Sequence, residues 1–255
     1  MKRILFAGAV ALTAASPALA ADLPVAPPPP PQAPAAYMPP ASPVYNWGGI
    51  YLGINAGGAY FTQNGTTNTI TSTGTSVGTG PSISTWGYAA GGQIGANFQM
   101  NEVVFGIEGD ADYLSNNTTV TITDPAGTAS ASHQFELDVL STVRGRLGFA
   151  IDRTLLYGTG GLAMGEYQVT RTQLTGTAGA ATPGTAETVN NLRLGWTAGA
   201  GIEYAFSDNW TVKGEYLYAN LESVTDTYPI SNRTQVAPTM GVSIGRIGLN
   251  YKFNF

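Results

Sequence analysis

The clearest pattern in the sequence is the stretch Gly245-Arg246-Ile247-Gly248-Leu249-Asn250-Tyr251-Lys252-Phe253-Asn254-Phe255. Its apolar residues stand at every second position, and the residues between them are small or polar. A period of two places alternate side chains on opposite faces of a strand, so one face is apolar and the other is polar. The apolar face ends in aromatic residues, which outer-membrane barrels place at the membrane interface. The stretch therefore predicts the closing strand of a transmembrane β-barrel.

The amino-terminal segment has the pattern of an export signal. Lys2 and Arg3 precede an apolar run over residues 4–15, and Ala18 and Ala20 form a small-x-small cleavage site. This pattern predicts a signal peptide over residues 1–20 and secretion across the inner membrane. The alternative is a retained membrane anchor, but the run is shorter than the roughly 20 apolar residues of a spanning helix.

A proline-rich segment follows the signal. Of the 16 prolines, 11 lie between Pro17 and Pro43. Proline at this density favours extended polyproline II rather than sheet or helix. We therefore predict a disordered periplasmic linker over residues 21–46, followed by the barrel over residues 47–255. A sharper interpretation makes the linker a contact for peptidoglycan.

Composition excludes several classes of protein. The chain has no cysteine, which excludes disulfides and cysteine-ligated metals. Only 11% of its residues are charged, against about 25% in a typical soluble domain. Removing Lys2 and Arg3 with the signal takes the formal net charge from −5 to −7. A nucleic-acid partner would need a basic surface, so none is expected.

Seven further segments alternate like the closing strand, which predicts an all-β, eight-stranded antiparallel up-and-down barrel. Their expected lipid-facing residues begin with Ile50, Trp86, Val103, Leu137, Leu155, Leu192 and Trp210. The fifth face comprises Leu155, Tyr157, Ala163, Tyr167 and Val169. Three tight turns, at 100–102, 151–153 and 207–209, alternate with four long loops at roughly 63–84, 115–133, 170–190 and 222–240. Short periplasmic turns and long extracellular loops are typical of such barrels.

The opposite faces of these strands carry the charge. They include Glu108, Asp110, Asp112, Asp138, Arg144, Arg146, Glu166, Arg193, Glu203, Lys213, Glu215, Arg246 and Lys252. An eight-stranded barrel has an interior just wide enough for side chains to fill it. Because an unpaired buried charge is costly, we predict an interior ion-pair network that plugs the barrel or leaves a thin polar path. A soluble β-sandwich or lipocalin-like barrel is the alternative, and the aromatic strand ends and export signal count against it.

Several motifs resemble those of one family. The first is Trp47-Gly48-Gly49-Ile50-Tyr51-Leu52-Gly53-Ile54-Asn55-Ala56-Gly57-Gly58, and others are Tyr157-Gly158-Thr159-Gly160-Gly161, Gly195-Trp196-Thr197-Ala198-Gly199 and Lys213-Gly214-Glu215-Tyr216. Together they resemble the alphaproteobacterial 25- and 31-kilodalton outer-membrane proteins over nearly all of residues 45–255. The resemblance implies a fold like the OmpA membrane domain and an abundant surface protein that supports the integrity of the envelope. It also implies two alternatives, a porin and a haemin binder. The longer proline tract departs from the family.

Three function classes follow: a structural surface barrel with long loops, a small-solute diffusion porin, and a haemin- or ligand-binding receptor. His133 and Tyr228 are the loop residues that could ligate haem iron. An enzyme could use His133 with Ser130 or Ser132, but we expect a solvated loop histidine, no catalytic residue, no metal site and no cofactor.

The expected partners follow from the location. They are outer-membrane lipid, lipopolysaccharide and the barrel-assembly machinery, while the sequence does not predict an oligomeric state. In outer-membrane proteins generally the assembly machinery reads the terminal aromatic strand. Tyr251, Phe253 and Phe255 are therefore the expected assembly signal.

Overall fold

The computed structural model describes residues 45–65, 67–70, 75–79, 82–116, 118–123, 130–176 and 181–253. The predicted signal peptide, the linker up to residue 44 and the terminal Phe255 lie outside these residues. None of the described residues forms a helix long and apolar enough to span a membrane.

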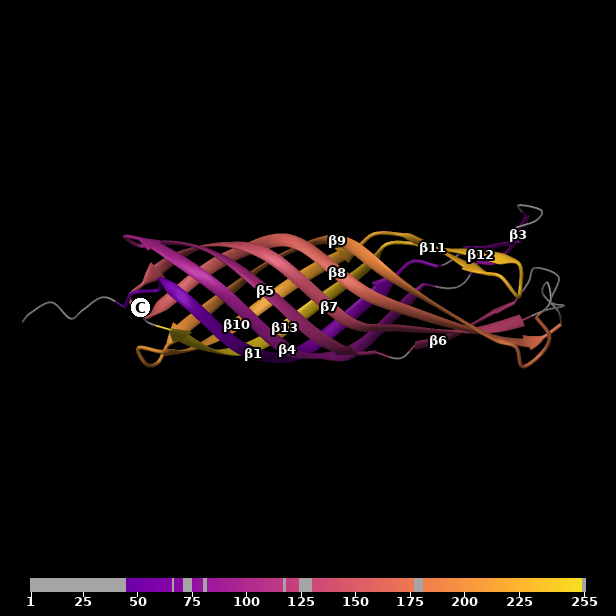
Figure 1. Cartoon of the computed structure of the whole chain (residues 1–255), viewed down its shortest axis with the longest axis horizontal. Helices are drawn as coiled ribbons and strands as arrows, with labels where there is room; N and C mark the ends of the chain where they lie inside the picture. Colours follow the sequence, from indigo (N-terminus) through magenta and orange to yellow (C-terminus); the bar gives the residue numbers. More distant parts are fainter. Residues whose placement is uncertain are drawn as a thin grey trace, which may run out of the picture. The chain divides into compact units, whose positions relative to one another are not determined.

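Eight antiparallel strands form a closed barrel, which confirms the predicted fold class (Figure 1). They are β1 (Gly49–Gln63), β4 (Ile83–Met100), β5 (Val103–Ser115), β7 (Ser130–Ile151), β8 (Thr154–Thr175), β9 (Ala186–Ala205), β10 (Trp210–Leu221) and β13 (Met240–Phe253). Each strand pairs with its neighbour in the chain, and β1 pairs with β13 to join the first and last strands. This pairing leaves no free edge in the barrel wall, as a membrane requires.

The predicted tight turns lie at one end of the barrel. Two residues join β4 to β5 and another two join β7 to β8. Asn101 and Asp152 in these turns have φ angles of 54° and 51°. Asn and Asp tolerate this left-handed conformation better than other side chains, so the turns can be very short.

The predicted long loops are largely strands, which corrects the sequence-based expectation. Five short strands lie at the end opposite the tight turns (Figure 1): β2 (Thr67–Ile70), β3 (Thr75–Thr79), β6 (Thr118–Thr123), β11 (Val224–Tyr228) and β12 (Arg233–Ala237). They build a four-stranded sheet in the order β11-β12-β2-β3, while β6 pairs with the first residues of β7. The segments are rich in threonine, which suits strands better than the loops we expected. We call this region the extension.

The length of the strands supports this division. β7 and β8 have 22 residues each, about twice the 9–11 residues of a tilted membrane strand. Their halves nearest the tight turns form the barrel wall, and their other halves pair with each other in the extension.

Apolar side chains cover the outside of the barrel. Exposed residues include Ile50, Leu52, Ile54, Ile94, Phe98, Ile107, Val143, Leu147, Leu156, Leu162, Leu194, Ile202, Ile247 and Leu249. Aromatic residues such as Trp86, Tyr88, Tyr113, Trp196 and Tyr216 lie toward the extension, and Phe149, Tyr204, Trp210, Tyr251 and Phe253 toward the tight turns. This arrangement is the apolar band between two aromatic girdles of a membrane barrel.

The predicted lipid-facing side of the fifth segment is wrong. Leu155, Tyr157, Ala163, Tyr167 and Val169 are buried inside, whereas Leu156 and Leu162 are exposed on the outer wall. Both faces of β8 carry apolar residues, so a period of two alone could not identify the face in contact with lipid.

A β-bulge explains a second difference, in β7. The register of β7 against β8 shifts between Leu137 and Val139, so the intervening Asp138 has no partner residue in β8. A bulge of this kind reverses which face later residues occupy. Leu137 therefore points inward, whereas Val143 and Leu147 point outward.

Candidate functional site

A network of buried ions fills the middle of the barrel. Five carboxylates and four cations take part: Glu108, Asp110, Asp112, Glu203 and Glu215 with Arg144, Arg146, Lys213 and Arg246. They project from β5, β7, β9, β10 and β13 because the inward positions of a strand recur at every second residue. Every one of them is at most 7% exposed.

Two arginines tie several carboxylates together. Arg144 Nη2 lies 2.5 Å from Glu108 Oε1 and 2.7 Å from Asp110 Oδ2, while its Nη1 lies 3.1 Å from Glu215 Oε1. Arg246 Nη1 lies 2.5 Å from Asp112 Oδ2, and its Nη2 lies 2.7 Å from Glu215 Oε2. Charge-assisted hydrogen bonds of this kind compensate for part of the cost of burying the ions.

One ion pair joins opposite walls of the barrel. Lys213 on β10 donates to both carboxylate oxygens of Glu108 on β5, at 2.8 and 2.9 Å. In the cyclic strand order, β10 and β5 are four strands apart in either direction. The pair therefore crosses the full width of the interior.

Neutral side chains extend the network toward the tight turns. Tyr51 OH donates to Glu108 Oε2 at 2.6 Å, and Tyr157 OH donates to Glu215 Oε1 at 3.0 Å. The guanidinium of Arg146 lies 4.0 Å from the centre of the Tyr157 ring and bonds Glu203 at 2.7 Å. Neither tyrosine was predicted to join the network: β1 carries no charge that marks its inward side, and Tyr157 was expected to face lipid.

The residues just before β1 cover the end of the barrel that carries the tight turns. Trp47 is 1% exposed, and its indole Nε1 donates to the carbonyl of Asp152 at 3.1 Å. Tyr45 packs edge-on against Trp47, and Lys252 Nζ lies 4.2 Å from the centre of the Tyr45 ring. Burial raises the pKa of Tyr45 to about 12, so its hydroxyl remains a donor to the carbonyl of Asp208. We call Tyr45–Trp47 the mouth segment.

An apolar layer lies on the other side of the network, toward the extension. Its buried members are Ala59, Phe61, Ala89, Leu114, Phe135, Leu137, Leu140, Ala163, Tyr167, Val169, Leu217, Ala219, Leu221, Tyr228, Met240, Val242 and Ile244. Packed side chains of this size exclude water as a protein core does. The interior thus has three successive layers: the mouth segment, the ion network and the apolar layer.

Four of the thirteen charges that we predicted to face inward lie outside the network. Lys252 is buried at the mouth segment, and Arg193 stacks over the Tyr167 ring at 3.9 Å and donates to the carbonyl of Pro238. Two expectations need correction. Glu166 is exposed on the outer face, because the residues of β8 that we expected to face lipid face inward instead. Asp138 is half-buried at the bulge.

His133 and Tyr228, the expected haem ligands, lie together in the extension. Their ring centres are 6.4 Å apart, but they are only 1% and 0% exposed. Tyr228 OH donates to Gln235 Oε1 at 3.2 Å. Burial, together with the nearby cations Arg171 and Arg233, lowers the pKa of His133 to about 3. The expectation of a solvated loop histidine is therefore wrong, and this packing gives a haem macrocycle no access to either ring.

The described residues form no catalytic or metal-binding cluster. Among them, no group of three or more His, Asp or Glu side chains could hold a metal ion. The nearby Ser130 hydroxyl pairs with Thr175 Oγ1 at 2.8 Å, and Asp110 and Asp112 belong to the ion network. A Ser-His-Asp arrangement needs the three groups in contact, which these positions do not provide.

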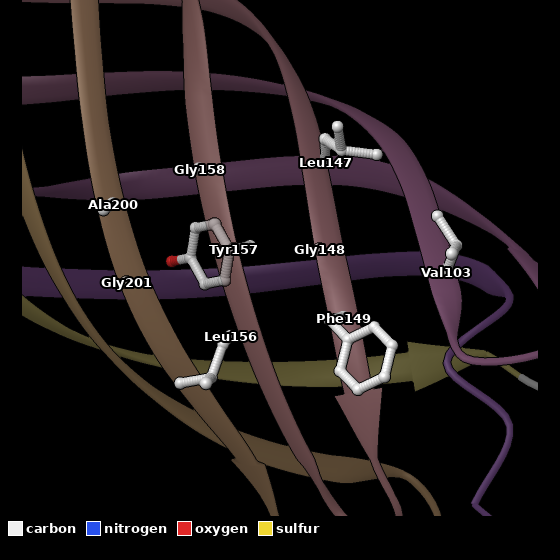
Figure 2. Close-up of a pocket in the computed structure, with 9 residues that line it drawn as sticks. All are labelled: Val103, Leu147, Gly148, Phe149, Leu156, Tyr157, Gly158, Ala200 and Gly201. Carbon is white, nitrogen blue, oxygen red and sulfur yellow. The ribbon is translucent and has the colours of Figure 1, made fainter.

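A hollow of about 620 Å³ lies on the lipid-facing wall. Figure 2 shows the residues that line it. The side chains of Leu147, Phe149 and Leu156 surround it, and glycines at 148, 158 and 201 contribute no side chain. The lining contains no charged residue, and the hydroxyl of Tyr157 already bonds Glu215 inside the barrel. The hollow is thus part of the apolar wall rather than a site for chemistry.

Comparison with known proteins agrees with this architecture. A family model described as "Outer membrane protein beta-barrel domain" matches residues 31–254. The chain belongs to this family. Its location is the outer membrane.

Relatives of this outer-membrane barrel confirm the resemblance to the alphaproteobacterial proteins. The 31 kDa outer-membrane immunogenic protein of Brucella melitensis is 34% identical, over 99% of this chain and 100% of that protein. The 25 kDa outer-membrane immunogenic protein of the same organism is 26% identical, over 83% of this chain and 82% of its own length. Among solved structures, neisserial surface protein A is similar with a TM-score of 0.41 and 14% identity, over 80% of this chain and 97% of that chain.

Proposed function

We propose that this outer-membrane barrel is a structural surface protein that supports the envelope and does not conduct solutes. The contact that carries the proposal is the Lys213–Glu108 pair, which joins opposite walls at 2.8 Å. A solute moving along the barrel would have to break this buried pair. Breaking a buried pair costs about 3–5 kcal/mol, since each ion is then left without its partner.

The layers on either side of the network support the same proposal. The mouth segment covers one side with Trp47, and the apolar layer covers the other with side chains such as Phe61 and Leu217. A hydrated ion would have to lose water molecules to pass through the apolar layer, and that layer offers little hydrogen bonding in return. The small-solute porin is therefore the weaker alternative for this interior.

The extension suits a role in surface contact. Hydroxyl and amide groups line its outer face, where Gln168 bonds Asn190 at 2.8 Å and Thr170 pairs with Thr188 at 3.0 Å. Backbone pairing orders the strands of the extension, so these polar side chains are held in fixed positions. We propose that the extension is the part of the protein that other molecules meet at the cell surface.

Conductance of the purified, folded protein in a planar bilayer tests the proposal. We expect a conductance near zero, measured beside a diffusion porin in the same bilayer. A Trp47→Ala variant should stay near zero as well, since the ion network and the apolar layer remain. Folding of each sample is checked by its heat-dependent mobility on a gel. Steady openings of the parent protein would contradict the proposal and favour the porin.

A further inference from the structure

The mouth segment joins parts of the barrel that are distant from one another in the chain. The backbone N–H of Trp47 donates to Gln99 Oε1 at 2.6 Å, and its indole donates to the carbonyl of Asp152 at 3.1 Å. Tyr45 OH donates to the carbonyl of Asp208 at 3.4 Å. The acceptors lie 52, 105 and 163 residues further along the chain than their donors, and each belongs to or adjoins a different tight turn. The mouth segment thus binds all three turns at once.

The same segment contacts the last strand beside the join between β1 and β13. Lys252 Nζ donates to the carbonyl of Asn46 and lies 4.2 Å from the centre of the Tyr45 ring. Asn209, in the turn before β10, accepts from Lys252 N at 2.7 Å and donates to Lys252 O at 2.8 Å. A line of contacts therefore runs from the residues before β1, through the last strand, to the turn before β10. It spans the join at which the barrel closes.

Apolar packing adds to these hydrogen bonds. Trp47 is 1% exposed and shares a buried cluster with Val104, Ala150, Leu155 and Ala205. These four residues come from β5, β7, β8 and β9, in that order. Four strands thus supply the site into which the indole fits, and no single strand supplies it. The site is complete only when these strands lie side by side in the wall.

We propose that the mouth segment is a latch that docks after the barrel has closed and then holds it shut. Before closure, the turns and the last strand are separate parts of the chain, so contacts with the mouth segment would cost loop-closure entropy with little return. After closure the partners lie together, and docking stabilises the folded state alone. A contact that is absent from the transition state slows unfolding and leaves the folding rate unchanged. The latch therefore determines how long a closed barrel stays closed.

Docking also hides two aromatic side chains from solvent. Tyr45 is 6% exposed and Trp47 is 1% exposed when the segment is docked. An undocked segment presents both residues in a chain that the barrel no longer holds. A protease that cleaves after aromatic residues can then reach the peptide bond after Tyr45. Cleavage at this bond therefore reports whether the latch is docked, whether or not the barrel conducts solutes.

Folding and unfolding rates of the full-length protein in lipid bilayers test the proposal. The folded fraction is followed by heat-dependent mobility on a gel after jumps in urea concentration. Trp47→Ala should raise the unfolding rate at least about tenfold, because it removes a buried aromatic side chain, and should change the folding rate less than about twofold. Slower folding with an unchanged unfolding rate would overturn the proposal, because the segment would then dock early. Two unchanged rates would overturn it as well.

A milder variant keeps the test informative if Trp47→Ala folds poorly. Gln99→Ala removes the acceptor of the Trp47 backbone N–H and leaves every aromatic residue in place. It should raise the unfolding rate by a smaller factor, again with little change in the folding rate. A Gln99→Ala protein that folds more slowly and unfolds at the rate of the parent would contradict late docking.

Cleavage of the folded protein by chymotrypsin after Tyr45 gives a second readout. The parent should resist cleavage, and Trp47→Ala should be cleaved at least about tenfold faster, since cleavage follows the population of the undocked form. Trp210→Ala is the matched control, because this tryptophan lies on the outer wall at the same end and packs against Tyr251. The control should be cleaved as slowly as the parent. Equal cleavage of the parent and Trp47→Ala would overturn the latch.

Discussion

The barrel and the extension use the same strands with opposite arrangements of polarity. In the barrel, β7 places Arg144 inside and Val143 outside, in contact with lipid. In the extension, the neighbouring strand β8 places Val169 inside, and Gln168 lies on the outer face. Along this pair of strands the interior therefore changes from an ion network to apolar side chains mixed with polar ones, among them the buried Arg171–Glu187 pair.

The difference follows from what surrounds each region. Hydrocarbon outside the barrel makes an apolar outer face favourable, so the charges can only be placed inside, where they must pair. Water outside the extension allows a polar outer face, so apolar side chains such as Val169 are buried there beside polar ones. The apolar layer lies inside the barrel wall, but its buried apolar side chains resemble those of the extension rather than the ion network.

The largest effect should come from breaking the ion network. Glu108→Gln keeps the shape of the side chain but leaves Arg144 and Lys213 without their main shared partner. We expect a loss of about 3–5 kcal/mol in the free energy of unfolding, since the cations stay buried. Urea-dependent unfolding in lipid bilayers would measure the loss.

The matched control for this change is Glu166→Gln, which neutralises an exposed glutamate on the outer face. Surface substitutions of this kind usually change stability by less than about 0.5 kcal/mol. If both variants lost the same stability, the ion network would not support the barrel as we describe it.

The second largest effect should come from a charge on the outer face, which should destabilise the barrel more than the extension. Ile247 is 68% exposed and its partners in the neighbouring strands are Ala56 and Gly214. Ile247→Arg places a cation in the lipid and should cost about 2–4 kcal/mol. Gln168→Arg, on the outer face of the extension, should cost less than about 0.5 kcal/mol. Equal costs in bilayer unfolding measurements would contradict the change of surroundings between the two positions.

The barrel could be predicted because lipid leaves a strict pattern in the sequence. The closing strand alternates without exception from Ile247 to Phe253, and the structure exposes each of its apolar residues. The charges Glu108, Arg144, Lys213 and Arg246 could be assigned to the interior for the same reason. Their individual partners could not, because these depend on which strands face each other across the barrel.

The extension could not be predicted because it lacks such a strict pattern. Its short strands are rich in threonine, and their polar outer faces are typical of loops as well. Tyr167 and Val169 look like lipid-facing residues, since a strand covered by a core and a strand covered by lipid share the period of two. The bulge at Asp138 left no signal in the sequence that we could use.

The smallest effect concerns pH and is confined to the extension. The pKa of His133, about 3 in the folded protein, lies below the ordinary value of about 6.5. As pH falls below 6.5, His133 becomes protonated in the unfolded segment but stays neutral in the folded one. Between pH 6.5 and 5.5 the stability of the extension should therefore decrease by up to about 1.4 kcal/mol.

Amide hydrogen exchange at β6 and at the first residues of β7 would measure this change between pH 7.5 and 5.5, after correction for the intrinsic rate. His133→Leu is the control, and it should remove the dependence. Burial raises the pKa of Asp226, so that carboxyl acts with the opposite sign, but it is present in both proteins. The difference between parent and variant thus isolates His133. Barrel amides near Arg144 should show no such difference, because His133 packs against Phe135 and Tyr228, on the far side of the apolar layer from the ion network. A matching change there would mean that the two regions unfold as one unit.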